Sequence, residues 1–148
     1  MRLWHYKLIP VLPRQQLLGQ WRECCLIAKE IKEKGNPHHI LVNKVLSNSG
    51  DFLCYCMMVE REMKSRGYKV GDKASTKLYK DIVDCNIVYY DNIIANLTPF
   101  PDWHNVRYLR QCYYNLQEKY DCGAISEEEW NKILEQVKVF IDARFMDV

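Results

Sequence analysis

The sequence has no long apolar run. None of its hydrophobic stretches approaches the roughly 18 residues that a helix needs to cross a membrane. Near the start, Pro10, Pro13 and Arg14 interrupt the segment where a secretory signal peptide would need continuous apolar residues. We therefore expect a cytoplasmic protein that has no membrane partner.

Metal-binding cysteine pairs are also missing. The seven cysteines are an odd number, and no two of them have the C-x-x-C spacing of zinc sites. Cys54 and Cys56 are two positions apart, so on a helix they would not share a face. Cys24 and Cys25 fall on the core side of an expected helix, where a reactive thiolate would lack exposure. These patterns predict reduced thiols, no bound metal and no cofactor.

Runs that alternate apolar and polar residues between turns, the pattern of β-strands, are nearly absent. Helical spacing recurs instead, in segments bounded by proline, glycine and capping residues. The expected helices are Pro13 to Lys34, Leu41 to Leu46, Asp51 to Arg66, Ser75 or Thr76 to Leu97, His104 to Tyr120, and one that begins with the capping box at Ser126 and runs through Ile141. With 148 residues, of which 48% are hydrophobic, the chain is long enough for one core. The sequence predicts an all-α, single compact domain over residues 1–148, with about five or six helices.

Charge is small in total but unevenly distributed. The formal net charge is +2. Residues 1–22 contain four lysine or arginine residues and no acidic residue. Between Arg61 and Lys80 there are seven lysine or arginine residues and two acidic residues. If the two segments converge in space, they would form a surface for phosphate groups. If they do not, they are solvated helix exteriors, and charge alone favours neither reading.

The first expected helix has two distinct faces. Its core side carries Leu17, Trp21, Cys24, Cys25, Ala28 and Ile31, and its opposite side carries Gln15, Gly19, Arg22, Glu23 and Leu26. Glycine inside a helix costs roughly 1 kcal/mol relative to alanine, so Gly19 requires a reason. Either it leaves room for a ligand to approach Glu23, or a neighbouring helix crosses closely there.

Arg22 and Glu23 are adjacent, so they do not form the usual ion pair between residues four apart on a helix. A guanidinium suits a phosphate, and a carboxylate suits a proton or a developing positive charge. The two side chains could therefore combine phosphate binding with acid-base chemistry on either side of Gly19.

Two stretches stand out as motifs: Leu12-x-x-Gln15-x-Leu17-x-x-x-Trp21-Arg22-Glu23 near the chain start, and Lys64-Ser65-Arg66-Gly67-Tyr68 further on. Both resemble segments of the pyrimidine-dimer DNA glycosylases of the phage endonuclease V type. The opening Met1-Arg2-Leu3-Trp4-His5, together with the run from Leu12 to Cys25, is closer still to a bacterial branch of that family. The resemblance covers about the first 70 residues and is loose beyond them, with His104-Asn105 as the most suggestive match.

The resemblance implies a helical enzyme that excises a damaged base from double-stranded DNA and then nicks the strand. In that family the chain's own terminal amine attacks the sugar C1′ and forms a Schiff base. An α-amino group has a pKa of about 7.7 to 8.0, against about 10.4 for lysine, so part of it is neutral and nucleophilic near pH 7. Glu23 falls on the family's catalytic acid, and Arg22 and Gln15 fall on residues that hold the DNA. The substrate nucleotide would have to be flipped out of a kinked duplex.

Two residues depart from the family pattern. The family's nucleophile belongs to a threonine exposed by removal of the initiator methionine, whereas position 2 here is Arg2. Since methionine is seldom removed before so large a residue, we expect the Met1 amine to be the nucleophile. Leu26 occupies the position at which the phage-type enzymes have a basic residue, which predicts fewer phosphate contacts or a different lesion preference.

The expected site therefore consists of catalytic residues and DNA contacts near the chain start: Met1 and Glu23 for catalysis, and Arg2, His5, Arg14, Gln15 and Arg22 for DNA binding. We expect the protein to act as a monomer. Two alternatives stay open at this point. One is a DNA-binding module on the same scaffold that has lost its nucleophile, and the other is a helical interaction domain with no affinity for DNA.

Overall fold

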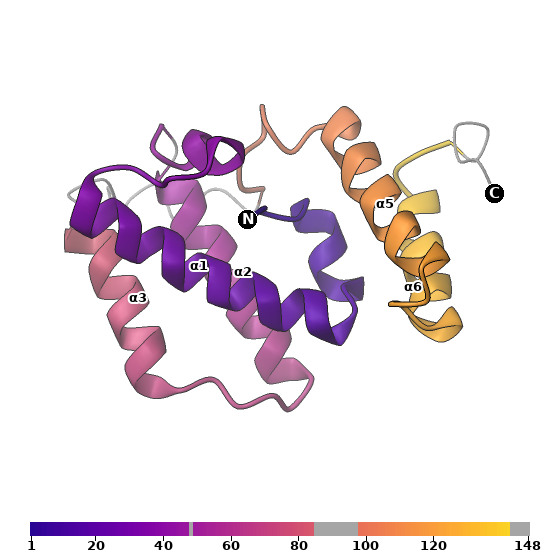
Figure 1. The fold of residues 1–148 in the computed structure, drawn as a ribbon, viewed down its shortest axis with the longest axis horizontal. Coiled ribbons are helices and arrows are strands. Elements are labelled where there is room, and N and C mark those ends of the chain that lie inside the picture. Colours follow the sequence, from indigo (N-terminus) through magenta and orange to yellow (C-terminus); the bar gives the residue numbers. More distant parts are fainter. Residues whose placement is uncertain (48, 85–97, 143–148) are drawn as a thin grey trace.

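The computed structural model describes residues 1–47, 49–84 and 98–142, and within these ranges the chain forms helices and no β-strand (Figure 1). Five α-helices and two short 3₁₀-helices are present there. The all-α class expected from the sequence is confirmed. None of the described helices is long and apolar enough to span a membrane.

Helix α1 (Arg14–Lys34) is the longest element, and two further helices pack along it. Pro13 precedes its first turn with an extended ψ of 153°, and Gly35 ends it in the left-handed conformation, with φ 76°. α2 (Ser49–Ser65) and α3 (Asp72–Asp84) lie against α1, with α2 behind it in Figure 1. The three helices form one layer of packing around the core.

The C-terminal part of the fold is a helical hairpin. α5 (Val106–Asp121) and α6 (Glu127–Lys138) pack on each other, and α6 also packs on η1 (Tyr6–Val11), a 3₁₀-helix near the chain start. Ser126 and Glu129 form the expected capping box at the start of α6, so that prediction is confirmed. The hairpin is thereby attached to the N-terminal segment on the right of Figure 1.

The core is continuous across these elements. Its largest fully buried side chains include Tyr55 from α2, Tyr113 from α5, Leu17 from α1 and Phe100 from the segment before α5. The expected core face of α1 is buried as predicted, except that Cys25 is only half-buried. Gln20, a polar residue, is also buried on that face.

The structure differs from the expected helices at several places, among them the end of α6, which is Lys138 and not Ile141. η2 (Ile40–Val45) is a 3₁₀-helix where a short helix was expected, and η1, which contains Pro10, was not expected. α3 begins at Asp72, so the prediction that Ser75 or Thr76 caps it is wrong. The Ser75 hydroxyl instead donates a hydrogen bond to the Glu60 carboxylate on α2, at 2.9 Å. The expected continuation of this helix to Leu97 lies outside the described residues, because the description stops after residue 84.

Two buried histidines join the chain start to the segment before α5. The rings of His5 and His104 stack at 5.1 Å between centroids, and they are 1% and 4% exposed. His5 Nε2 donates to the His104 carbonyl oxygen at 2.7 Å, and His104 Nδ1 accepts from the Tyr6 amide at 3.1 Å. Burial lowers the pKa of His5 to about 4 and that of His104 to about 3, so both rings are neutral at pH 7.

This pair predicts a loss of stability in mild acid. In the unfolded chain a histidine binds its proton near pH 6.5, whereas in the folded protein these rings do so only near pH 4 and 3. The unfolded state therefore binds more protons in this window, and the free energy of unfolding should fall as the pH drops from 6.5 toward 4. Urea unfolding at a series of pH values measures this slope.

His104→Asn should flatten that slope, because asparagine can still accept from the Tyr6 amide but does not titrate. His38→Asn is the matched control, since His38 is exposed. A His104→Asn protein with the same pH dependence as the parent would contradict the prediction.

Candidate functional site at the chain start

Side chains from several helices hold the main chain of residues 2–6. The Arg2 amide donates a hydrogen bond to Glu23 Oε2 at 2.9 Å. Gln20 Nε2 donates to the Arg2 carbonyl oxygen at 3.0 Å, and Gln20 Oε1 accepts from the Trp4 amide at 2.7 Å. Glu23 and Gln20 both project from α1, so this helix holds residues 2 and 4.

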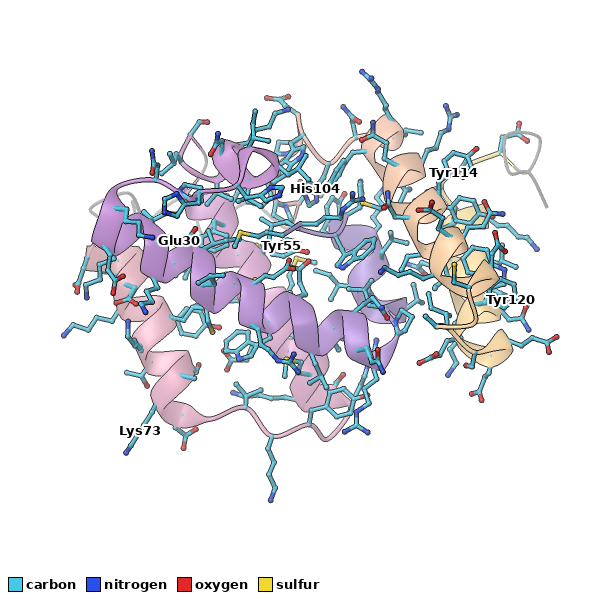
Figure 2. All side chains as sticks on the ribbon, in the orientation of Figure 1. Glu30, Tyr55, Lys73, His104, Tyr114 and Tyr120 are labelled. Carbon is cyan, nitrogen blue, oxygen red and sulfur yellow. The ribbon has the colours of Figure 1, made fainter. Side chains whose placement is uncertain are left out.

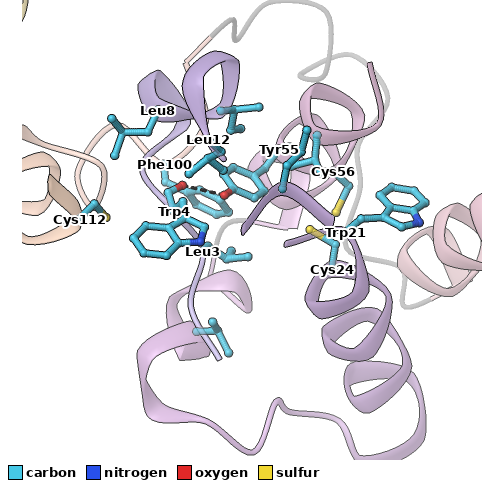
Figure 3. Close-up of a cluster of buried hydrophobic side chains, with 14 of the residues drawn as sticks. Leu3, Trp4, Leu8, Leu12, Trp21, Cys24, Tyr55, Cys56, Phe100 and Cys112 are labelled. Carbon is cyan, nitrogen blue, oxygen red and sulfur yellow. Dashed lines mark hydrogen bonds between the residues drawn. The ribbon is translucent and has the colours of Figure 1, made fainter. Parts of the chain in front are cut away.

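Two tyrosine hydroxyls complete these contacts. The Tyr55 hydroxyl lies 2.7 Å from the Trp4 carbonyl oxygen, the dashed contact in Figure 3, and 2.9 Å from Gln20 Oε1. The Tyr108 hydroxyl donates to the Leu3 carbonyl oxygen at 2.6 Å. Burial raises the pKa of Tyr55 and of Tyr108 well above the usual value of 10, so both hydroxyls keep the proton that they donate.

The Glu23 carboxylate lies directly beside the start of the chain. Its side chain is half-buried, as are Met1 and Arg2. Since only two carbon atoms separate the nitrogens of Met1 and Arg2, covalent geometry holds the Met1 nitrogen within about 4 Å of the amide that contacts Glu23. The Met1 nitrogen and the Glu23 carboxylate therefore belong to one site.

Gly19 keeps the approach to this site open. It lies four residues before Glu23, so the two share one face of α1. Among the described residues, a Cβ atom built at Gly19 would meet no atom within 4 Å outside its own helix backbone and chain neighbours, and its φ is not in the left-handed region. No described helix therefore crosses closely at Gly19, and this part of the α1 surface is open.

The remaining expected DNA contacts on α1 are on the surface. Gln15 and Arg22 are exposed, and within the described part of the chain Arg22 forms no ion pair. Arg14 is exposed as well, with its guanidinium carbon 5.3 Å from the centre of the Tyr68 ring. Leu26 continues the same exposed face at 44% exposure. These side chains can reach a large ligand that lies along α1.

His5 differs from this pattern. Its ring is 1% exposed, Nε2 donates to the His104 carbonyl oxygen, and Nδ1 accepts from the Lys7 amide at 3.2 Å. Both ring nitrogens are thus occupied inside the protein. The expectation that His5 contacts DNA is corrected here: a buried ring with no free nitrogen can position the chain start but cannot bind a phosphate.

The two basic segments meet where Arg66 and Tyr68 contact the chain around Pro10 to Arg14, but three of the seven basic residues in the second segment are paired with acids. Lys64 is paired with Glu60, Lys77 is paired with Asp81, and the Arg66 guanidinium is bound to Glu62. Arg66 also donates to the carbonyl oxygens of Leu12 and Pro10 at 2.7 and 3.0 Å, at the end of η1. Much of the charge between Arg61 and Lys80 is therefore neutralised by neighbouring acids or holds the N-terminal segment in place.

Sequence reasoning missed Gln20, Tyr55 and Tyr108. For Gln20 a signal was present, because it falls three residues after Leu17 and four before Cys24, on the core side of the helix. A polar side chain in that position needs partners, which here are main-chain groups. Nothing local marks Tyr55 or Tyr108 among the ten tyrosines of the chain.

The described residues contain no cluster of side chains that could hold a metal ion. Their six cysteines form no disulfide. Burial raises the pKa of the Cys25 thiol to about 11, so this residue is not a nucleophile near pH 7.

Comparison with known proteins connects this site to a family. The model of the family described as pyrimidine dimer DNA glycosylase matches residues 1–76. No curated protein and no solved structure matches the chain significantly. The matched segment contains η1, α1, η2 and α2, and with them Glu23 and the side chains that hold residues 2 and 4. Because 76 of the 148 residues are matched, the chain belongs to the pyrimidine dimer DNA glycosylase family.

Proposed function

We propose that this protein excises damaged pyrimidines from double-stranded DNA and then cleaves the strand, with the Met1 amine as its nucleophile. The observation that carries the proposal is the hydrogen bond between the Arg2 amide and Glu23, which keeps the first residues of the chain beside a half-buried carboxylate. The family membership supplies the reaction class.

In the proposed reaction the amine attacks C1′ of the damaged nucleotide, and the bond from C1′ to the base nitrogen breaks. The base leaves with the bonding electron pair and takes up a proton, and opening of the sugar gives a Schiff base between Met1 and C1′. Loss of a C2′ proton then expels the 3′ phosphate by β-elimination. Hydrolysis of the remaining Schiff base regenerates the free amine.

Glu23 serves two steps of this scheme. Its negative charge stabilises the positive charge that develops at the sugar, and its oxygens can accept and return protons. A carboxylate held by an amide donor is already oriented when the substrate arrives, which removes part of the entropy cost of the reaction. Glu23 is thus both acid-base group and electrostatic stabiliser.

Arg2, Arg14, Gln15 and Arg22 bind the DNA backbone in this proposal, and His5 positions the chain start. Gln15 and Arg22 lie on the same exposed side of α1 as Gly19, where the space is free. A duplex lying along this face would bring a phosphate to Arg22 and a sugar to Glu23. Affinity for DNA should decrease with increasing salt, as expected for phosphate contacts.

One observation favours the alternative of a DNA-binding module without catalysis. The nitrogen that donates a hydrogen bond to Glu23 is the peptide nitrogen of Arg2, which is not a nucleophile. The amine of Met1 belongs to the preceding residue. If that displacement keeps the amine from the sugar, DNA binding would persist without base release or strand cleavage.

Borohydride trapping tests the proposed nucleophile. Incubation with an abasic duplex at pH 6 to 9, followed by reduction, should link the protein covalently to DNA. Digestion of the adduct and mass spectrometry should place the sugar fragment on the Met1 nitrogen. The intact mass of the protein, measured first, identifies which residue carries the free amine.

Glu23→Gln and N-terminal acetylation separate the roles of the two groups. Glu23→Gln keeps an acceptor for the Arg2 amide but loses the charge, so release of the damaged base should fall by more than a hundredfold while duplex affinity stays within about threefold. Acetylation should abolish the adduct. DNA binding without any adduct from the unmodified protein would instead favour the non-catalytic module.

Gly19 provides a graded test of how DNA approaches. Gly19→Ala and Gly19→Leu should each raise the free energy of unfolding by about 0.5 to 1 kcal/mol, because alanine and leucine are better helix formers and the added Cβ atom contacts none of the described residues. Gly19→Leu should also slow base release at least tenfold by filling the space beside Glu23, with Gly19→Ala between it and the parent. A leucine variant that is more stable and fully active would mean that the substrate does not pass over this turn.

A further inference from the structure

A recess opens next to the candidate site, between η2 and α5. It has a volume of about 540 Å³, which is within the usual range for ligand-binding pockets. Its lining comes from Arg2, η2, the segment before α5 and α5 itself: Arg2, Ile40, Leu41, Lys44, Trp103, Asn105, Arg107, Tyr108, Gln111 and Asn115. We call this recess the η2–α5 pocket.

The charge of the η2–α5 pocket is of one sign. Its lining contains three basic residues, Arg2, Lys44 and Arg107, and no acidic residue. Lys44 and Arg107 are exposed, and neither forms an ion pair within the part of the chain that the structure describes. Two exposed, unpaired cations and several amide side chains suit an anionic ligand with oxygen acceptors.

Other recesses in the described part of the chain lack this character. The one between α1 and α3 is lined by lysines but also by Asp72 and Asp81, and Asp81 is already paired with Lys32 and Lys77. The recess at α6 contains two glutamates. Charge complementarity to a phosphate therefore distinguishes the η2–α5 pocket.

One wall of the same pocket is apolar and exposed. Ile40 is 78% exposed and Leu41 is 48% exposed, and both line the recess together with Lys44 and Arg107. Exposed aliphatic side chains beside unpaired cations fit a ligand that has both phosphates and flat apolar surfaces. A nucleic acid strand has both, with its sugars and bases alternating with phosphates.

Arg2 connects this pocket to the candidate active site. Its amide donates a hydrogen bond to Glu23, and Arg2 is one of the residues that line the pocket. Tyr108 makes a similar connection, because it lines the pocket and its hydroxyl holds the Leu3 carbonyl oxygen. A ligand in the η2–α5 pocket would thus contact Arg2, the residue next to the proposed nucleophile.

We infer that the η2–α5 pocket holds the stretch of DNA strand next to the reacting sugar, with Lys44 and Arg107 on its phosphate and Ile40 and Leu41 against its sugars and bases. The inference rests on the proposed function for the identity of the ligand. Ile40, Leu41 and Lys44 lie within the segment that the family model matches, whereas Arg107 and the other lining residues from Trp103 to Asn115 lie beyond it, so both parts of the chain form this pocket.

The test measures duplex affinity and adduct formation in Lys44→Ala, Arg107→Ala, Ile40→Ser and Lys73→Ala. Lys73 is the control, because it is an exposed lysine on α3 that points away from the chain start (Figure 2). Dissociation constants for an abasic duplex are determined by fluorescence anisotropy at several salt concentrations. The rate of borohydride adduct formation is followed at a fixed concentration of each protein.

Lys44→Ala and Arg107→Ala should each weaken binding about tenfold and reduce the slope of log affinity against log salt by about one, since each removes one phosphate contact. Ile40→Ser should weaken binding without changing that slope, because an apolar contact releases no counterions. Lys73→Ala should leave both quantities as they are. The adduct should form more slowly in the three pocket variants than in the parent.

The outcomes separate this inference from the proposed function. If the parent protein forms the adduct and the pocket variants bind and react like it, the η2–α5 pocket does not hold DNA and the inference is wrong. Equal losses in Lys73→Ala and in the pocket variants would also overturn it, since the effect would then be one of net charge. If the parent binds DNA through the pocket residues but forms no adduct, the catalytic proposal fails and the inference stands.

Discussion

Gln20 carries an amide group into the interior of the protein, and the arrangement of the chain start depends on how that group is satisfied. A buried amide without partners would cost several kcal/mol. Here its nitrogen donates to the Arg2 carbonyl oxygen and its oxygen accepts from the Trp4 amide and faces the Tyr55 hydroxyl. If residues 2 to 4 moved away from α1, several buried polar groups would therefore lose their hydrogen-bond partners at once. The position of the chain start is a consequence of core packing, not of a surface contact.

Both halves of the chain help to hold the first residues in place. The family match ends at residue 76, yet Tyr108 holds the Leu3 carbonyl oxygen and His104 accepts from the Tyr6 amide. The α5–α6 hairpin is attached through the same segment, since α6 packs on η1 and Gln136 donates to the Lys7 carbonyl oxygen. Residues outside the matched segment thus support the part of the protein that the family shares. They also line most of the η2–α5 pocket, which gives this half a route to influence the proposed site.

The elements that the sequence predicted well are those determined by neighbours in the chain. The core side of α1 follows from a 3.6-residue period, and the start of α6 follows from Ser126 and Glu129, which are three residues apart. Contacts across long separations were not predictable in this way. Tyr55 meets Trp4 from 51 positions away and Tyr108 meets Leu3 from 105 away, and no local pattern selects these two tyrosines from the others. The predicted helix cap at Ser75 was wrong for the same reason, because the Ser75 hydroxyl binds Glu60 of another helix and does not cap α3.

His5 and Glu23 show why residue type and position near a chain start do not fix a role. Both were expected in the site, but His5 has its two ring nitrogens bonded inside the protein, while Glu23 has only part of its hydrogen-bonding capacity used by one amide. Chain termini usually fray, and a nucleophile on a freely moving terminus would lose entropy each time it attacked. In the proposed mechanism that loss has already occurred on folding, because the contacts of residues 2 to 6 fix the path that leads to the amine. The buried groups therefore order the terminus, and the half-exposed carboxylate is left to act on the substrate.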